Sequence, residues 1–268
     1  MEKIKRNLLP VLRKEQLQIM DVIHDICVRN GITYYMIGGT ALGAVRHKGF
    51  IPWDIDIDIA MPRKDYLLFK TISKSESPKG YRFMDYEDDK YCHTNHGFYT
   101  CKSERVDAVG GGAKFGIFID IFPLDFAPND KNEQKKHADR IRNLRKIEYY
   151  FSHSHIPSIK PHIRLKNIAK FFSRGIQSIY SLQRLNHKID CVMQLYNAED
   201  SNYLCSMCSH YSYEKQCMDK NIYGIPQLVK FEDKEYYAPQ NLHEYLTRIF
   251  GNYMKVPSVE EQNLWLED

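Results

Sequence analysis

Three aspartates alternate with isoleucines over residues 54–59, and carboxylates at this spacing could bind a metal ion. A period of two is typical of a strand, because successive side chains leave opposite faces of the backbone. Asp54, Asp56 and Asp58 would then share one face, at a spacing of about 7 Å. Ionised carboxylates placed in this way repel one another unless a cation lies between them, and Mg²⁺ or Mn²⁺ would take their oxygens as ligands. The alternative is a half-exposed edge strand with solvated acids, although aspartate is depleted in strands.

A further acid, Asp120, stands inside a nearly continuous apolar run that extends from Phe115 to Leu124. A buried carboxylate must be paired with a cation or bind a metal, so Asp120 is a second candidate for the same chemistry. An ordinary salt bridge to a nearby Arg or Lys is the alternative. Asp125 follows Pro123 and is interpreted as a turn or cap residue, with a role in substrate binding left open.

A glycine pair precedes the aspartates and could hold phosphate. Residues 33–37 are expected to form a short strand, which Gly38, Gly39 and Thr40 interrupt before a helical turn over residues 41–46. Glycines let the backbone come close to a ligand, and the N-terminus of a helix favours phosphate. A Gly-Gly turn alone is weak evidence and is usually only a turn. Beside an acid-bearing strand, it indicates a phosphate site next to a metal site.

Basic residues follow the glycine pair. Arg46 and Lys48 would add donors and positive charge before the aspartates, as partners for the phosphates of a substrate. The alternative is a solvated basic turn.

Residues 38–66 resemble the LicD family of phosphotransferases. Their sequence is GGTALGAVRHKGFIPWDIDIDIAMPRKDY, which includes the glycine pair, the basic residues and the first three aspartates. That family is related to the fukutin-type ribitol-phosphate transferases and belongs to the nucleotidyltransferase-fold superfamily. Residues 231–257 resemble the C-terminal signature of the family, and the resemblance is weakest over residues 130–200. The family commonly has Asp-Asp-Asp-Ile-Asp after the Trp, and this chain has Ile55 at the second of those positions.

The resemblance implies a set of site residues. Asp56 and Asp58 correspond to the metal-binding pair with Asp54 just before them, and Asp120 corresponds to the third carboxylate of the superfamily. The implied catalytic residues are Asp56, Asp58 and Asp120, and all four aspartates are candidate ligands for Mg²⁺ or Mn²⁺. The implied substrate-binding residues are Gly38, Gly39, Thr40, Arg46 and Lys48.

The resemblance also implies an activity, which is transfer of a phospho-alcohol from a CDP-activated donor to a hydroxyl. Phosphocholine is the leading candidate, and the acceptor would be a cell-surface glycan such as teichoic acid or its lipid-linked precursor. Three alternatives stay open: transfer of ribitol or glycerol phosphate, transfer of a whole nucleotide, and a non-catalytic module that binds nucleotide or glycan. Three retained carboxylates argue against the last of these, because they are costly without a cation.

The chain is long enough for a sizeable core, and its charge is nearly balanced. The chain has 268 residues and a net charge of only +4, from 38 basic and 34 acidic residues, so a nucleic-acid partner is not expected. It lacks an apolar run long enough for a signal peptide or a membrane span, so we expect a cytoplasmic protein, with a peripheral position at the inner face of the membrane left open.

A second possible metal site involves cysteines. Cys205, Cys208, His210 and Cys217 resemble half of a zinc site, but the spacing lacks a second compact pair, and reduced free thiols are the favoured interpretation. His93 and His96 lie three residues apart without a helical pattern around them, and a metal-binding role is not favoured for them.

Several elements would position these residues. We predict helices over residues 11–30 and from Arg63, because apolar residues recur there at helical spacing. Residues 130–200 are charged and favour helix, which indicates an inserted helical subdomain with basic faces. The predicted fold is an α/β nucleotidyltransferase-like mixed sheet flanked by helices, with a helical insertion. The predicted division is a catalytic core over 1–129, the insertion over 130–200, and a C-terminal segment over 201–268 that packs on the core.

Overall fold

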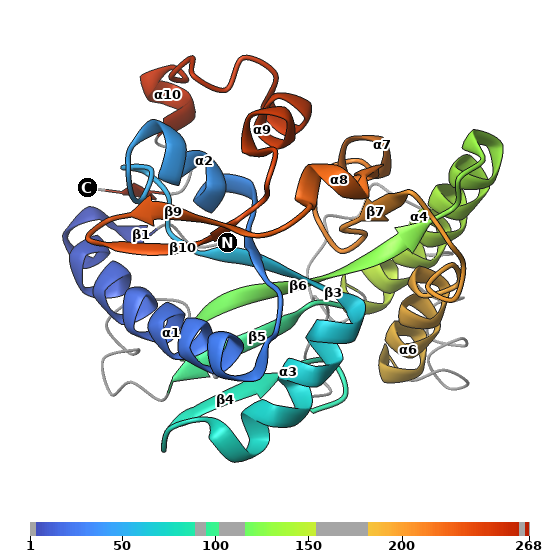
Figure 1. Ribbon diagram of the computed structural model, residues 1–268, viewed down its shortest axis with the longest axis horizontal. Helices are drawn as coiled ribbons and strands as arrows, with labels where there is room; N and C mark the ends of the chain where they lie inside the picture. The colour runs from blue at the N-terminus through green and yellow to red at the C-terminus, as the bar shows by residue number, and fades with distance from the viewer. Residues whose placement is uncertain (1–3, 89–94, 102–115, 154–181, 263–265, 268) are drawn as a thin grey trace, which may run out of the picture.

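The chain folds as a mixed α/β structure in which helices flank a curled mixed sheet (Figure 1). This confirms the predicted fold class. The computed structural model describes all residues except 1–3, 89–94, 102–115, 154–181, 263–265 and 268.

The central sheet has seven strands. Its main path follows the order β2, β3, β6, β5, β4, while β7 pairs with β6 and β8 pairs with β7. β3 and β6 are parallel, and the other neighbouring pairs of this sheet are antiparallel. The strands span Tyr35–Met36 (β2), Asp58–Pro62 (β3), Tyr81–Met84 (β4), Gly97–Cys101 (β5), Ile117–Ala127 (β6), Tyr203–Cys205 (β7) and Met218–Asp219 (β8).

The helices surround this sheet. α1 and α3 contact each other and pack on β6, whereas α2 lies between α9 and the hairpin formed by β9 and β10 (Figure 1). The helices span Leu9–Asn30 (α1), Gly38–Arg46 (α2), Arg63–Glu76 (α3), Lys131–His153 (α4), Leu182–Met193 (α6), Tyr213–Gln216 (α7), Lys220–Tyr223 (α8), Leu242–Phe250 (α9) and Val259–Gln262 (α10), with a short 3-10 helix over Arg6–Leu8; the hairpin strands are Gln227–Phe231 (β9) and Lys234–Ala238 (β10).

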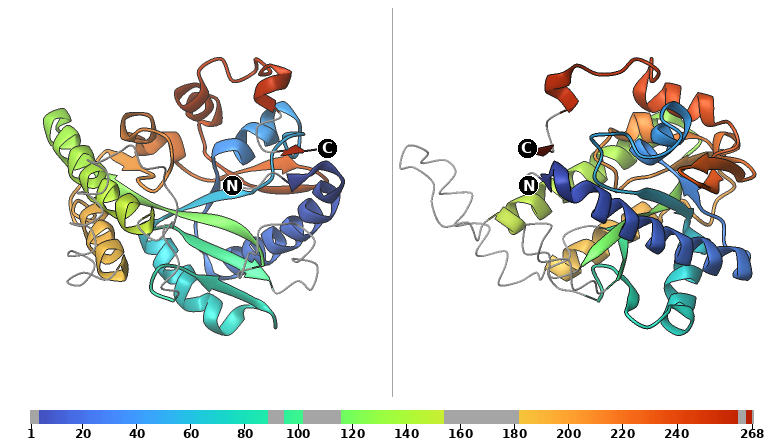
Figure 2. Two further views of the ribbon diagram at one scale, coloured as in Figure 1. Left: turned by 180° about the vertical axis from the view of Figure 1, so that it is seen from behind. Right: turned by 90° about the vertical axis from the view of Figure 1, so that its left-hand side faces the viewer.

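The two ends of the described chain lie side by side. β1 (Ile4–Lys5) pairs in parallel with β11 (Leu266–Glu267), as Figure 2 shows at the positions marked N and C. Among the described residues, the helices are all too short or too polar to cross a membrane.

The first predicted helix is confirmed as α1. Apolar side chains at helical spacing give α1 one buried face, which packs on β5, β6 and α3. The buried apolar residues of α1 are Leu9, Leu12, Ile19, Met20, Ile23, Ile26 and Cys27. The helix ends at Gly31, whose φ of +63° is a left-handed conformation that favours glycine. The second predicted helix, which begins at Arg63, is confirmed as α3.

The acid-bearing strand begins later than predicted. Asp54 and Asp56 lie in a loop, and β3 begins only at Asp58. Side chains of α1 bind this loop: one nitrogen of Arg13 donates to three of its carbonyls, and the Gln16 amide donates to a fourth. Carbonyls that are held by side chains do not pair with a neighbouring strand, so the regular ladder starts after them. The four carbonyls belong to Ile51, Pro52, Asp54 and Ile55.

The glycine pair also differs from the prediction. Gly38, Gly39 and Thr40 do not form a turn before a helix at residue 41, because they are themselves the first residues of α2. Gly38 has a φ of +53°, a left-handed conformation that lets the chain enter the helix directly from Ile37.

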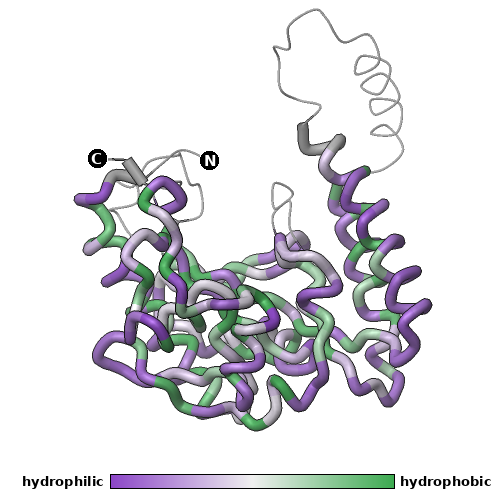
Figure 3. The backbone as a smooth tube through the Cα atoms, turned by 90° about the horizontal axis from the view of Figure 1, so that it is seen from above, coloured by the Kyte–Doolittle hydropathy of each residue, from purple (hydrophilic) through white to green (hydrophobic). Residues whose placement is uncertain are grey.

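α4 and α6 form a pair at one end of the molecule (Figures 2 and 3). Figure 3 shows mostly hydrophilic residues along both helices, interrupted by hydrophobic ones. The hydrophobic residues form a small core of their own with the segment around β7, which includes Ile141, Leu185, Ile189, Val192, Met193, Cys205, Met207 and Cys217. The division of the chain into three parts stays a prediction.

Candidate active site

Three aspartates converge at the centre of the sheet. Carboxylate oxygens of Asp56, Asp58 and Asp120 all lie within 4.8 Å of one another, and the three side chains are half-buried. Three hard oxygen donors at this distance are able to hold a divalent cation such as Mg²⁺ or Mn²⁺. Within the described part of the chain, this is the one group of three or more acidic, histidine or cysteine side chains that converges in this way.

Strand pairing brings the aspartates together. Asp58 of β3 and Asp120 of β6 are register partners, and the Asp120 N–H donates to the carbonyl of Ile57 over 3.1 Å. Side chains on β6 alternate, so that Ile119 and Ile121 are buried on one face while Asp120 is on the other. Asp56 reaches the same place from the loop that Arg13 and Gln16 hold.

Asp54 lies beside this cluster and is not one of its three members. A Cβ atom on Gly39 would lie 2.5 Å from Asp54 Oδ2, so the first turn of α2 approaches this carboxylate closely. Asp54 Oδ1 also accepts a hydrogen bond from the Ile55 N–H. Its role as a metal ligand stays a prediction.

The protein environment makes the charged forms of these acids costly. Burial raises the pKa of Asp56 to about 8, and the charges of Asp54 and Asp120 add to the effect. Burial and the same neighbouring carboxylates raise the pKa of Asp58 well above its ordinary value, and burial raises the pKa of Asp54. A bound divalent cation would favour the ionised forms, so this donor set fits a metal better than it fits three free carboxylates.

The start of α2 is packed tightly around Asp58. A Cβ atom on Gly38 would lie 3.2 Å from Asp58 Oδ2, while the Gly38 N–H donates to the Tyr245 hydroxyl of α9. The Thr40 hydroxyl accepts a hydrogen bond from the Asp58 N–H over 2.8 Å. Gly38, Gly39 and Thr40 therefore shape the acid site, and their binding of phosphate stays a prediction.

Arg46 and Lys48 lie further along the same segment. Arg46 donates to the carbonyls of Tyr253 and Lys255 and lies over the ring of Trp53, so it anchors the C-terminal segment. Lys48 is exposed and has a φ of +61°, and its carbonyl accepts from the Glu232 N–H. Their role as partners for substrate phosphate stays a prediction.

His96 is a site residue that sequence reasoning did not favour. Its Nε2 lies 2.9 Å from Asp120 Oδ1, and its ring stacks on Phe122 with the centroids 4.5 Å apart. Strand pairing between β5 and β6 positions it, because His96 immediately precedes β5. The alternating pattern of β5 and β6 could have signalled this contact, but only with the register known. His93 lies outside the described residues.

Tyr211 is a second site residue that the sequence did not indicate. Burial raises its pKa to about 12, with contributions from the charges of Asp58, Asp54 and Asp56, so its hydroxyl lies near the acid cluster. Its ring contacts Phe250 of α9 edge-on. No sequence motif marks this tyrosine among the 19 in the chain.

The four residues of the possible zinc site do not converge on one point among the described residues. Cys205 and Cys217 lie close together, whereas Cys208 contacts the sulfur of Met193 and His210 packs on Tyr211. The structure therefore assembles no zinc ligand set from them.

The interpretation of Asp125 as a turn or cap residue is wrong. Asp125 lies inside β6, is fully buried, and forms a two-bond ion pair with Arg63 of α3 at 2.6 and 2.7 Å. Asn197 donates to it as well, over 2.6 Å. Because Pro123 pairs within the sheet opposite Met61, the proline does not end the strand.

Comparisons with known proteins place the chain in a family. The family model described as LicD/FKTN/FKRP, nucleotidyltransferase domain, matches residues 31–161. The chain is 32% identical over 272 residues to the lipopolysaccharide cholinephosphotransferase LicD of Haemophilus influenzae, and the match covers 94% of each chain. Uncharacterized proteins of Rickettsia typhi and Rickettsia prowazekii are 42% and 39% identical over 65 and 64 residues, which is 24% of this chain and 21% and 24% of theirs.

Proposed function

This chain belongs to the LicD/FKTN/FKRP nucleotidyltransferase family, and from that premise we propose that it is a metal-dependent phosphotransferase. The donor is CDP-choline, the group transferred is phosphocholine, and the acceptor is a hydroxyl of a cell-surface glycan or its precursor. The similarity to a cholinephosphotransferase over 94% of both chains supports choline as the alcohol. We expect the reaction to occur in the cytoplasm.

The convergence of Asp56, Asp58 and Asp120 is the observation that carries this proposal. A module that only binds nucleotide or glycan has no use for three carboxylates whose ionisation burial opposes. An enzyme that transfers phosphoryl groups does have such a use, because its substrates bring negative charge that must be neutralised.

These three aspartates would hold Mg²⁺ or Mn²⁺, which when bound neutralises the diphosphate of the donor and stabilises the departing CMP. The protein groups around them keep the site in shape. Arg13 and Gln16 hold the loop that carries Asp56, and Thr40 holds the first residue of β3.

In the transfer, the acceptor hydroxyl oxygen forms a bond to the phosphorus of phosphocholine while the bond from that phosphorus to the CMP oxygen breaks. The hydroxyl proton must leave in the same reaction. We assign it to the pair formed by Asp120 and His96, whose atoms Oδ1 and Nε2 are 2.9 Å apart. The hydrogen bond also orients the Asp120 carboxylate toward the other two acids.

The test is mass spectrometry of products. Purified protein is incubated with Mg²⁺, a panel of glycan acceptors, and CDP-choline, CDP-ribitol or CDP-glycerol in separate reactions. The expected result is a glycan whose mass increases by one phosphocholine, formed only with CDP-choline and abolished by EDTA. Modification from CDP-ribitol or CDP-glycerol instead would overturn choline as the alcohol. Calorimetry that detects no metal-dependent binding of any of these donors would overturn the enzymatic role.

A further inference from the structure

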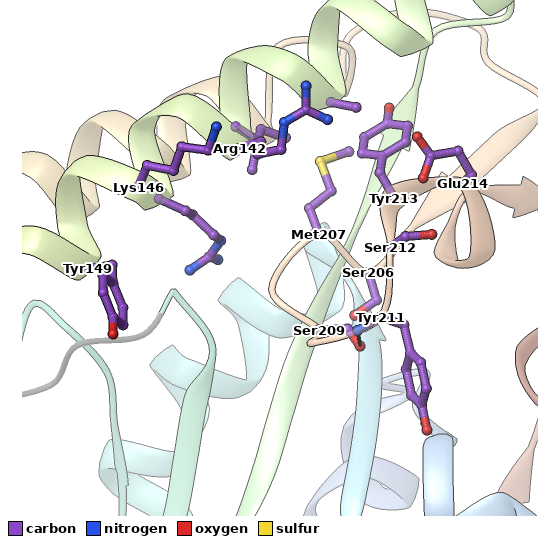
Figure 4. Close-up of a pocket in the computed structure, with 13 residues that line it drawn as sticks. Arg142, Lys146, Tyr149, Ser206, Met207, Ser209, Tyr211, Ser212, Tyr213 and Glu214 are labelled. Carbon is purple, nitrogen blue, oxygen red and sulfur yellow. Dashed lines mark hydrogen bonds between the residues drawn. The ribbon is translucent and has the colours of Figure 1, made fainter.

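A cavity of about 580 Å³ is lined in part by Tyr211, the tyrosine near the acid cluster. One of its walls is α4, and the other is the segment from Ser206 to Glu214, which follows β7 and includes the first two residues of α7 (Figure 4). The described residues that line it come from these two walls, and the comparisons assign it no role.

The α4 wall is basic. Arg142, Arg145 and Lys146 stand at positions i, i+3 and i+4, so they share one face of the helix. One acid, Glu214, is present among the described residues of the lining. Arg142 and Arg145 also have acidic neighbours on α4, at Asp139 and Glu148, neither of which lines the cavity.

Two buried polar atoms of the lining have no hydrogen-bond partner among the described residues. One is the Nη2 atom of Arg145, which is a donor. The other is the hydroxyl oxygen of Ser206, a residue that is 1% exposed. They come from opposite walls of one cavity. Because unpartnered buried polar atoms are costly, an anion that accepted a hydrogen bond from either of them would lower that cost.

The other two serine hydroxyls of the second wall accept hydrogen bonds within the fold. Ser209 accepts from the Gln216 amide, and Ser212 caps α7. The lining also includes apolar residues, and Met207 extends into the cavity between the two walls (Figure 4). Arginine side chains above an apolar surface suit a phosphate attached to a sugar, since the sugar ring has apolar faces.

Tyr211 connects this cavity to the acid cluster. It lines the cavity, and Figure 4 shows its hydroxyl pointing away from α4 toward the ribbon of α2. In the proposed reaction, the donor diphosphate lies at the aspartates. The cations of α4 line the cavity and are not part of the acid cluster, so they are available for a different anion.

We propose that this cavity binds a phosphate group carried by the saccharide acceptor and so positions the acceptor hydroxyl toward the aspartates. This inference rests on the proposed function and adds a substrate class to it. The enzyme would prefer an acceptor that is already phosphorylated, and an enzyme that phosphorylates the sugar must act before it.

The test follows the methyl signal of Met207 by NMR in protein labelled at the methionine methyl groups. Met207→Leu identifies the signal. Glucosamine 6-phosphate, glucosamine and CDP-choline are titrated separately without metal, so that binding is measured independently of transfer. The sugar phosphate is expected to shift the Met207 signal, and neither of the other two compounds is expected to do so.

Variants of basic residues on α4 test whether these side chains bind the phosphate. The double variant Arg142→Gln, Lys146→Gln changes two exposed residues and is expected to weaken glucosamine 6-phosphate binding by about tenfold or more. Arg140→Gln is the matched control, because Arg140 is exposed on the same helix and does not line the cavity. Equal weakening in both variants would overturn the proposal.

The remaining outcomes are also decisive. A Met207 shift with CDP-choline would make this a donor site, and an equal shift with glucosamine would remove phosphate as the recognised group. If the Met207 signal is unchanged with all three compounds while phosphocholine transfer is normal, the role of the cavity in binding phosphate is overturned and the proposed reaction is not. Binding of the sugar phosphate by a protein that transfers no phosphocholine would leave the cavity assigned and overturn only the reaction.

Discussion

Asp58 and Asp120 are register partners on the neighbouring parallel strands β3 and β6. This pairing joins two sequence motifs that are far apart in the chain into one acidic site. Side chains of register partners leave the same face of a sheet, so the two carboxylates meet wherever this register is kept. Asp56 joins them from the loop before β3.

Neutralising the acids is expected to separate activity from stability. Asp58→Asn or Asp120→Asn should lower turnover by about a hundredfold or more, in line with the contributions of catalytic acid–base groups. Without metal, the same changes should leave the thermal midpoint unchanged or raise it, because they remove repulsion within the cluster. Turnover and thermal midpoint are measured with and without Mg²⁺. Near-normal turnover in Asp120→Asn would exclude this residue from the reaction.

Changing His96 is expected to weaken the contribution of Asp120 to turnover or to Mg²⁺ binding, although Asp120 itself is retained. His96→Phe keeps an aromatic ring against Phe122 but loses the hydrogen bond to Asp120. Turnover or Mg²⁺ affinity should fall by about 10–100-fold, as for other residues that orient metal ligands. His96→Gln retains a donor and should recover part of the loss. The measurement is turnover as a function of Mg²⁺ concentration, and an unchanged curve for His96→Phe would contradict this role.

Gly38 and Gly31 provide a matched pair of glycines. Both have a left-handed φ, +53° and +63°, so changing either to alanine should cost about 1–2 kcal/mol of folding stability. Only at Gly38 does the added Cβ meet a side chain, since it would lie 3.2 Å from Asp58 Oδ2, whereas nothing lies within 4 Å at Gly31. Gly38→Ala should therefore also weaken activity, and Gly31→Ala should not. Equal activity of the two variants at equal stability would show that the first turn of α2 does not shape the acid site.

The buried ion pair between Arg63 and Asp125 is expected to matter for folding more than for chemistry. Arg63→Met leaves Asp125 buried without its main partner, which should lower the free energy of unfolding by about 3–5 kcal/mol. Arg29→Gln removes exposed ion pairs with Asp25 and Glu76 and should lower the free energy of unfolding much less. Denaturant unfolding measures both effects. Folded Asp125→Asn protein should retain most of its turnover, and a hundredfold loss would place Asp125 in the reaction.

Acid pH is expected to destabilise the fold in part through His137. Burial lowers the pKa of His137, and this outweighs the opposite effects of its hydrogen bond to the Val192 carbonyl and of the Asp125 charge. The unfolded chain then binds a proton at a higher pH than the folded chain does. The stability contributed by neutral His137 is present above the unfolded pKa of about 6.5 and is lost as pH falls below it.

The measurement is the free energy of unfolding between about pH 5 and pH 8, a window around the ordinary histidine pKa. The curve for His137→Gln should be flatter over this window than that of the unchanged protein. The other histidines whose pKa is lowered, at positions 24, 47 and 210, contribute equally to both curves. Parallel curves would show that His137 does not carry this dependence.

Local patterns predicted much of the fold. The apolar spacing of α1 and its glycine stop were sufficient to identify that helix, and the alternation around Asp120 placed one acid in an apolar strand. The position of β3 was predicted less well, because Arg13 and Gln16 bind the carbonyls of the loop before it from a distant helix. A period-two pattern cannot show which residues of a run are held by side chains in place of a strand partner.

The apolar residues around Asp120 were enough to predict that this carboxylate needs a partner, because a charged side chain among isoleucines is costly however the chain folds. The burial of Asp125 was not predicted. Which partner each buried carboxylate meets depends on the three-dimensional fold. Asp120 meets Asp58, Asp56 and His96 and becomes part of an acid site, whereas Asp125, five residues further along the same strand, meets Arg63 and becomes part of the core. The physical reason is that the free energy of a buried charge depends on the groups within a few ångströms of it, and strand register and helix packing bring those groups from distant parts of the chain.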